Sequence, residues 1–203
     1  MIAEAEKIMK KKSFIRKDME RQLGKKLSDE IWTDATEKLS ELLVRYNDLP
    51  KGVHTHTDNY IFPSASVYLC AKEKVDQKTA YSIIENSASA LTNDVAQKLG
   101  NFMKIPGMPS LFIKMWDVMC KKLYGENNGF RNIYYDNKKG EYRMDVISCP
   151  FCHFFKELGC FELTKIYCEN DDRVYGNLPH IEFIRTSTLG KGGDKCDFYA
   201  RKI

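Results

Sequence analysis

Apolar residues recur at helical spacing through the first half of the chain and beyond. After Ser28, a residue suited to cap a helix, five apolar side chains fall on one helical face: Ile31, Ala35, Leu39, Leu42 and Tyr46. Residues 47–52 include Pro50 and are expected to end this helix, because proline cannot continue the backbone hydrogen-bond ladder. The pattern therefore predicts one long helix between Ser28 and Tyr46.

Three more helices are predicted before residue 125. One begins after Pro63 with Ser64 as its cap, and the next begins at Asp76 and ends near Gly100. The apolar face of this second helix is formed by Ala80, Ile83, Ile84 and Leu91. The last helix begins at Ser110. Its apolar stripe is expected to lie in the core and consists of Leu111, Met115, Val118, Met119 and Leu123.

From residue 126 onward the pattern favours strands. Four runs are predicted to be strands: residues 130–135, 142–147, 181–185 and 195–201. Residues 136–140 are rich in turn formers and should join the first two strands as a hairpin. Short helices are expected from Pro150 to Leu158 and over residues 162–168, and residues 190–193 form a glycine-rich loop.

The predicted fold class is α+β. A helical N-terminal region, residues 1–125, is expected to pack on an antiparallel β-sheet in region 126–203, so that the two regions together form one compact domain. An apolar content of 43% is enough to build a core for a chain of 203 residues.

The net charge of +4 is unevenly placed. The first 26 residues hold nine basic and four acidic side chains, which is typical of a solvated helix face. No aromatic residues interleave these lysines, so nucleic acid is not expected as a partner. No segment resembles a membrane span or a cleaved leader, and the chain is expected to be cytoplasmic. Seven cysteines in such a compartment favour free thiols, metal ligation or catalysis over disulfides.

Most of the reactive side chains lie in the last third of the chain. They are five cysteines, Cys149, Cys152, Cys160, Cys168 and Cys196, together with Asp171, His180, Arg185 and Asp197. Cys149 precedes Pro150, a residue favoured at the first position of a helix, and should therefore cap that helix. There the thiol would face unpaired N–H groups and is expected to ionise easily. The alternative is a small residue that simply fits the strand-to-helix corner.

Two other interpretations of these cysteines stay open. The spacing of Cys149 and Cys152 suits a thiol redox protein, although no βαβ unit precedes the pair. The five cysteines, with His153 or His180, could instead supply four ligands to zinc or another divalent metal. Against zinc, the chain has only one C-x-x-C pair, and Cys152 is expected to point away from Cys149 on the helix.

The final strand region offers groups that could bind an anion or move a proton. Arg185, at a strand end, could fork onto a substrate carboxylate together with Thr188. Asp197 could act as a general base or hold a loop. Strand alternation places Cys196 on the face opposite to Asp197, so the two should not share one pocket.

These C-terminal motifs resemble those of the L-2-amino-thiazoline-4-carboxylic acid hydrolase family. The matching stretches are residues 149–151, 157–159, 162–163, 168–171, 183–189 and 193–198. The resemblance implies hydrolytic opening of a cyclic amidine to a carbamoyl-cysteine. The glycine-rich loop followed by C-x-F is more distantly similar to 4-vinyl-reductase-type domains, some of which hold zinc through cysteines. Arg185 and Thr188 stand where ligands of such a zinc site would be expected.

Ring opening needs a nucleophile, a proton shuttle and a grip on the carboxylate. We assign Cys149 as the nucleophile, with activated water as the alternative, and Asp171 or Asp197 as the base. Arg185 and Thr188 would hold the carboxylate of a small-molecule substrate, with His180 as a further binding residue, and Cys168 and Cys196 would line the site. The competing hypothesis is a non-catalytic sensor module that binds a small molecule or metal, in which the helical half forms a homodimer.

Overall fold

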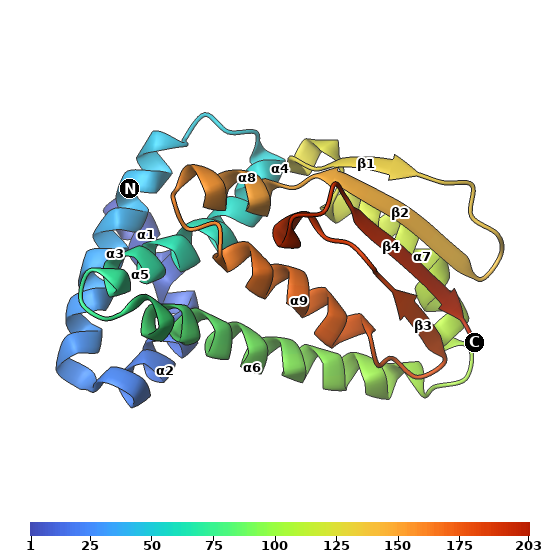
Figure 1. Ribbon diagram of the computed structural model, residues 1–203, viewed down its shortest axis with the longest axis horizontal. Helices are drawn as coiled ribbons and strands as arrows, with labels where there is room; N and C mark the ends of the chain where they lie inside the picture. Colours follow the sequence, from blue (N-terminus) through green and yellow to red (C-terminus); the bar gives the residue numbers. More distant parts are fainter.

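The computed structural model describes residues 1–203 and has a helical bundle at one end and a four-stranded sheet at the other (Figure 1). The N-terminal elements are α1 (Ile2–Lys11), α2 (Ser13–Leu23), α3 (Lys25–Arg45), α4 (Lys51–His56), the π-helix η1 (Thr57–Ile61), α5 (Phe62–Lys72), α6 (Gln77–Met103) and α7 (Met108–Leu123). None of the helices combines the length and the apolar character needed to cross a membrane.

The C-terminal elements complete the α+β fold that the sequence predicts. They are η2 (Glu126–Asn128), β1 (Arg131–Tyr134), β2 (Glu141–Ser148), α8 (Pro150–Glu157), α9 (Leu163–Tyr175), β3 (Ile181–Ile184), η3 (Leu189–Lys191) and β4 (Cys196–Lys202). The strand order is β1-β2-β4-β3, and every neighbouring pair is antiparallel. The predicted hairpin of the first two strands is confirmed.

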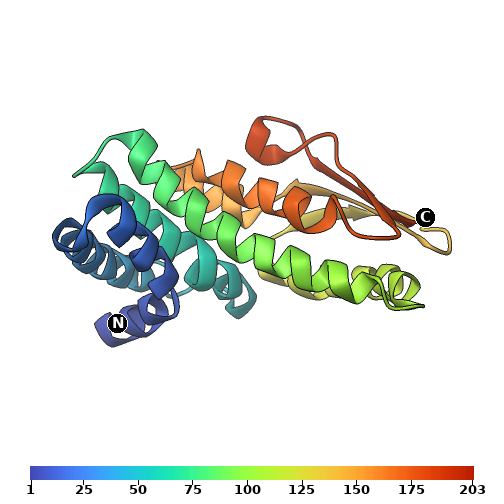
Figure 2. The same cartoon turned by 90° about the horizontal axis from the view of Figure 1, so that it is seen from below.

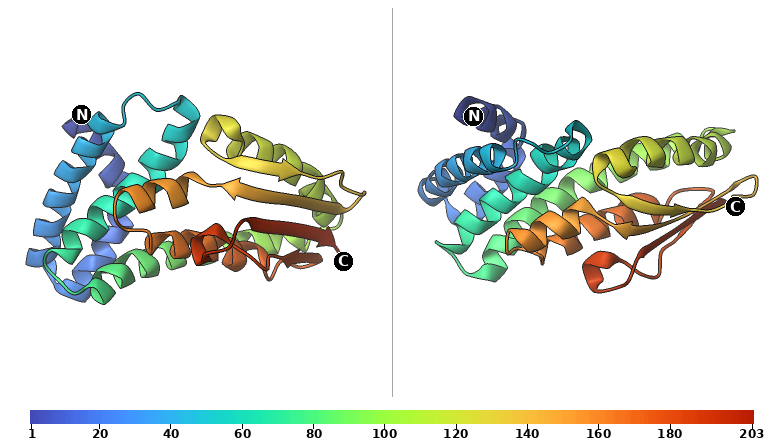
Figure 3. Two further views of the ribbon diagram at one scale, coloured as in Figure 1. Left: turned by 45° about the horizontal axis from the view of Figure 1, so that its top comes forward. Right: turned by 90° about the horizontal axis from the view of Figure 1, so that it is seen from above.

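Helix α6 connects the bundle to the sheet end of the molecule and runs beside α9 (Figure 2). Its N-terminus is capped as predicted, because the Asp76 carboxylate accepts the Thr79 N–H at 3.0 Å. Helix α7 packs on β2 and β4 and covers one face of the sheet (Figure 3). The sheet end is therefore a layer of strands with α7 against it.

Two predicted helix starts are wrong. Helix α3 begins at Lys25, after Gly24 turns the chain with a φ of +80°, and the Ser28 hydroxyl donates to the Gly24 carbonyl from within the helix. Helix α5 begins at Phe62, because the chain is already helical from Lys51 onward. Pro63 lacks the N–H of a regular helical bond, and the wider π turn immediately before α5 accommodates it.

The apolar stripe predicted for α7 is also wrong. Leu111, Met115 and Val118 are exposed, Val118 to 64%. The buried face is instead formed by Pro109, Ile113, Trp116 and Cys120, which share the same helical spacing. Trp116 stacks near Tyr142 of β2 and Phe183 of β3, so the larger aromatic contact decides which face of the helix turns inward.

Apolar residues form two clusters that each draw on both halves of the chain. The bundle cluster includes Phe154, Phe155, Leu163 and Ile166 from the C-terminal region, and the sheet cluster includes Met103, Ile113 and Trp116 from the N-terminal region. Phe151, in the first turn of α8, packs against both clusters. The start of α8 therefore lies where the two cores meet.

Candidate active site

The site begins at the junction of β2 and α8. Cys149 has extended backbone angles (φ −136°, ψ 128°) and immediately precedes Pro150, the first residue of α8. The prediction that Cys149 takes the N-cap position is confirmed, although its side chain makes no capping hydrogen bond. Its thiol faces the backbone N–H groups of Cys152 and Phe151, which favour the thiolate form.

The expectation of an unusually acidic thiol is nevertheless wrong. The neighbouring Cys152 thiol, followed by burial, raises the pKa of Cys149 well above its ordinary value. Cys152 does not point away from Cys149, because the cap residue and the third helical residue meet above the first turn, as in a capping box. At neutral pH Cys149 is therefore a protonated thiol beside a second thiol.

Two further cysteines join this corner from α9 and β4. The buried Cys196 sulfur accepts the Leu189 N–H at 3.3 Å. Cys168 lies on α9 under the glycine loop, beside the Thr188 hydroxyl. Burial raises the pKa of both thiols, and proximity to Cys149 adds to the rise in each case. The structure thus brings together Cys149, Cys168 and Cys196 as neutral thiols.

Gly190 allows the loop to close over Cys168. A Cβ atom at this position would lie 2.6 Å from the Cys168 sulfur and 2.8 Å from the Thr164 methyl carbon. We expect Gly190→Ala to lower the free energy of unfolding by about 1–3 kcal/mol, as overpacking does in other cores. Gly100→Ala on α6 is the control, since its Cβ would meet only Pro179 at 3.9 Å and should stabilise the helix. Urea unfolding of both variants measures the difference, and equal stability would contradict the tight contact.

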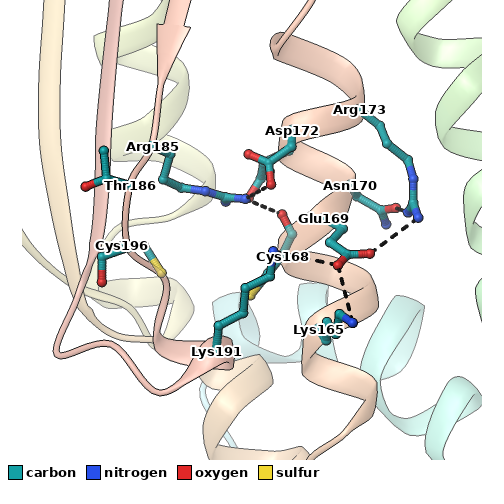
Figure 4. Close-up of polar contacts among 12 residues, drawn as sticks. Lys165, Cys168, Glu169, Asn170, Asp172, Arg173, Arg185, Thr186, Lys191 and Cys196 are labelled. Atoms are coloured by element: carbon teal, nitrogen blue, oxygen red, sulfur yellow. Dashed lines mark hydrogen bonds and ion pairs between the residues drawn. The ribbon is translucent and has the colours of Figure 1, made fainter.

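Arg185 joins the end of β3 to α9 (Figure 4). Its Nη1 donates to Asp171 at 2.8 Å, and its Nη2 contacts Asp172 at 2.7 Å and the Cys168 carbonyl at 2.5 Å. The guanidinium stacks over Phe198, and the side chain is only 1% exposed. Both terminal nitrogens are therefore engaged by the protein, and in this arrangement Arg185 positions two aspartates rather than reaching for a ligand.

Asp171 is the acid whose environment best suits proton transfer. Burial raises its pKa to about 6, although the Arg185 charge opposes the rise. Its side chain nevertheless keeps 35% of its surface accessible, and only Oδ2 has a hydrogen-bond partner. Asp171 is therefore a recessed carboxylate with one free oxygen that solvent can reach.

Aromatic hydroxyls lie near this carboxylate. Burial is the main cause of the raised pKa values of Tyr124 and Tyr175, and the charge of Asp171 adds to the rise in both. Tyr124 is also close enough to Cys149 and Tyr60 for their charges to raise its pKa further. Tyr124 is thus close enough to both Asp171 and Cys149 for their charges to act on it, which its position after a helix end did not reveal in the sequence.

The remaining predicted residues fall into two groups. Thr188 is buried beside Cys168, and its hydroxyl has no partner with hydrogen-bond geometry. Asp197 holds the loop after β3, since its carboxylate accepts the N–H groups of Thr186 and Ser187 and the Thr186 hydroxyl. These bonds outweigh partial burial and lower the pKa of Asp197.

His180 lies apart from this corner. It precedes β3 at the end of the sheet where β4 finishes, and its carbonyl accepts the Ile203 N–H. From there to Cys196 the sheet spans about 20 Å, at roughly 3.3 Å per residue. The structure therefore does not bring His180 to the cysteines.

No group of three His, Cys, Asp or Glu side chains is spaced to hold a metal ion. Zinc binding stays a prediction from the sequence alone. Asp172 was not foreseen as part of the site, although it follows Asp171 directly and its pairing with Arg185 could have been suspected from that adjacency.

The sequence model of the L-2-amino-thiazoline-4-carboxylic acid hydrolase family matches residues 54–199, well over half of the chain. The chain belongs to this family. The thiazoline-hydrolase match covers every residue of the corner described above, from the π-helix to β4, and leaves α1 to α3 outside. No curated protein and no solved structure matches the chain.

Proposed function

We propose that this protein hydrolyses L-2-amino-thiazoline-4-carboxylate, or a closely related cyclic amidine, to a carbamoyl-cysteine. Membership of the thiazoline-hydrolase family supports the hydrolytic class. The observation that carries the chemistry is Asp171, a reachable carboxyl with a pKa of about 6. A general base works best when its pKa lies close to the working pH.

The thiols favour a water route over a thiolate route. Cys149, Cys168 and Cys196 all have raised pKa values, so none of them is substantially ionised at neutral pH. Asp171 in contrast is mostly ionised at pH 7 and has a free oxygen. Attack by water with Asp171 as the base therefore replaces Cys149 as our preferred first step.

The proposed reaction moves both protons of the water through Asp171. Water adds to the ring carbon between nitrogen and sulfur while Asp171 takes one of its protons and passes it to the ring nitrogen. Asp171 then takes the proton of the added hydroxyl as the bond from this carbon to the ring nitrogen or sulfur breaks, and returns that proton to the departing heteroatom. The sum is substrate plus water giving a carbamoyl-cysteine, with the carboxyl group unchanged.

The other residues position these groups. Arg185 fixes Asp171 through the 2.8 Å contact to Oδ2 and leaves Oδ1 for the water. The N–H groups at the start of α8 can stabilise the negative charge on the added oxygen when its proton is removed and the ring opens. Cys168 and the unpartnered Thr188 hydroxyl offer polar contacts to the substrate.

Incubation of the purified protein with the L-thiazoline, followed by mass spectrometry, tests the proposal. We expect a product heavier by one water, accompanied by loss of the ring absorbance. The D enantiomer and the boiled protein are the controls. The absence of any product from the L-thiazoline and from related cyclic amidines would contradict the proposed function, and would favour the non-catalytic binding module instead.

A further inference from the structure

Lys12 is a partly buried cation without an acidic partner. It lies at the break between α1 and α2, and its ammonium takes part in no ion pair or side-chain hydrogen bond. The lysines with raised pKa values, such as Lys74 and Lys195, each contact an aspartate. Lys12 instead has a lowered pKa, because of burial and the neighbouring charge of Lys11. A buried charge without a partner destabilises the folded protein unless another interaction compensates for its lost hydration.

The ammonium of Lys12 is held above an aromatic ring at the site. Its Nζ lies 5.1 Å from the ring centre of Tyr60, which is 43% exposed and belongs to the π-helix η1. The Tyr60 ring lies 6.4 Å from that of Phe151, whose N–H faces the Cys149 thiol. Lys12 is thus separated from the cap of α8 by two aromatic rings.

Tyr60 also connects Lys12 to the proton-transfer side of the site. The Tyr60 hydroxyl is close enough to Tyr124 for its charge to raise the Tyr124 pKa, and Tyr124 is in turn close to Asp171. The π turn widens the helix at this point, as π turns often do at functional sites. Lys12 thus lies beside Tyr60 and Asp171 lies near Tyr124, and the two tyrosines are near each other.

Three cations around the loop of residues 185–195 already have carboxylate partners. Arg185 is 1% exposed and engaged by two aspartates, Lys191 pairs with Glu169, and Lys195 pairs with Asp145. We propose that Lys12 supplies the positive charge that draws the substrate carboxylate to the solvent-facing side of the site, beside Tyr60. The identity of the ligand rests on the proposed function, whereas the preference for anions does not.

This assignment gives the N-terminal helices a role in the site. Lys12 precedes the segment that matches the thiazoline-hydrolase family, which begins at residue 54. The basic arm would then contribute a specificity residue, in addition to a solvated surface. Its effect should depend on ionic strength, because salt at 0.1 M screens the attraction between partly exposed charges over about 10 Å.

Alkylation with two reagents of different charge tests the role of Lys12. Iodoacetate is an anion and iodoacetamide is its neutral counterpart, and both modify thiols. The rate ratio of the two reagents is measured in the full chain at Cys149, Cys152 and Cys168 by peptide mass spectrometry. We expect Lys12→Met to lower the iodoacetate to iodoacetamide ratio by about three- to tenfold at these cysteines.

The neighbouring Lys11 provides a matched control. The Lys11 side chain is exposed, so Lys11→Met removes an equal charge one residue away from Lys12. This variant should leave the ratio nearly unchanged. Lys12→Arg should keep it, and raising the salt concentration should lower the wild-type ratio towards that of Lys12→Met. An unchanged ratio in a Lys12→Met protein whose thermal unfolding matches wild type would overturn the assignment.

The two proposals can fail separately. If the thiazoline is not hydrolysed, the alkylation ratio still decides whether Lys12 selects anions. If hydrolysis is found, Lys12→Met should raise the KM for the carboxylate substrate and leave kcat close to wild type. A loss of kcat at unchanged KM would instead overturn the role of Lys12 in binding.

Discussion

Asp171→Asn is expected to lower kcat for thiazoline hydrolysis by about 10²- to 10⁴-fold, the usual contribution of a general base. Asparagine keeps the shape of the side chain and can still accept the hydrogen bond from Arg185. It cannot take a proton from water. Initial rates at saturating substrate, together with a circular dichroism check of the fold, measure this loss.

The neighbouring aspartate is the matched control. Asp172 also pairs with Arg185, at 2.7 Å, but is not the recessed carboxylate. Asp172→Asn should therefore keep most of the activity. Equal losses in the two variants would show that the pair acts only by holding Arg185.

The pH dependence gives a second check on Asp171. The base must be ionised, so kcat/KM should rise with pH through a midpoint of about 6 and then level off. The charge of Asp172 helps to raise the Asp171 pKa, and that of Arg185 lowers it. The midpoint should therefore move to lower pH in Asp172→Asn, and should disappear in Asp171→Asn.

Arg185→Met is expected to produce the largest loss of stability. Removing one member of a buried ion pair commonly costs about 3–5 kcal/mol, because the partner charge is left uncompensated. Here Asp171 and Asp172 keep 35% and 46% of their side-chain surfaces accessible, so water can solvate them in part. We therefore expect a loss of about 2–3 kcal/mol, after allowance for this screening.

Urea unfolding of Arg185→Met and Arg173→Met tests this expectation. Arg173 lies two residues beyond Asp171 on α9, is 27% exposed and contacts Glu169 and Asn170. Glu169 also keeps Lys165 and Lys191 as partners, so the loss of Arg173 should cost less than about 1 kcal/mol. Arg185→Lys should recover only part of the stability, since an ammonium cannot bridge two carboxylates and a carbonyl with a planar fork. A cost for Arg185→Met as small as that for Arg173→Met would contradict its role as the joint between β3 and α9.

Local patterns in the sequence predicted much of the fold. The alternating and turn-rich runs after residue 126 gave the hairpin and the α+β class, and Cys149-Pro150 gave a helix cap that the structure contains. The motifs around Arg185 and Cys196 pointed to the family to which the chain belongs. Each of these features depends on backbone preferences or on residues close together in the chain.

The tertiary structure decided which of the candidate groups could act. Ile113 and Trp116 turned inward instead of the predicted stripe of α7, because the sheet offered aromatic partners on that side. Cys149 is a weak acid rather than a strong one, because Cys152 and burial outweigh the N–H groups of the helix start. A local motif shows which groups are present, but desolvation and neighbouring charges set their ionisation.

The sequence by itself determined the α+β class, the capped corner at Cys149 and the concentration of thiols and acids in the last third of the chain. Only the tertiary structure joined Arg185 to Asp171 and Asp172, gave Asp171 its raised pKa and brought Lys12 to Tyr60. Contacts between residues far apart in the chain depend on how the helices and the sheet pack. The periodicity of hydrophobic residues shows which face of an element is buried, but not which distant residues meet there.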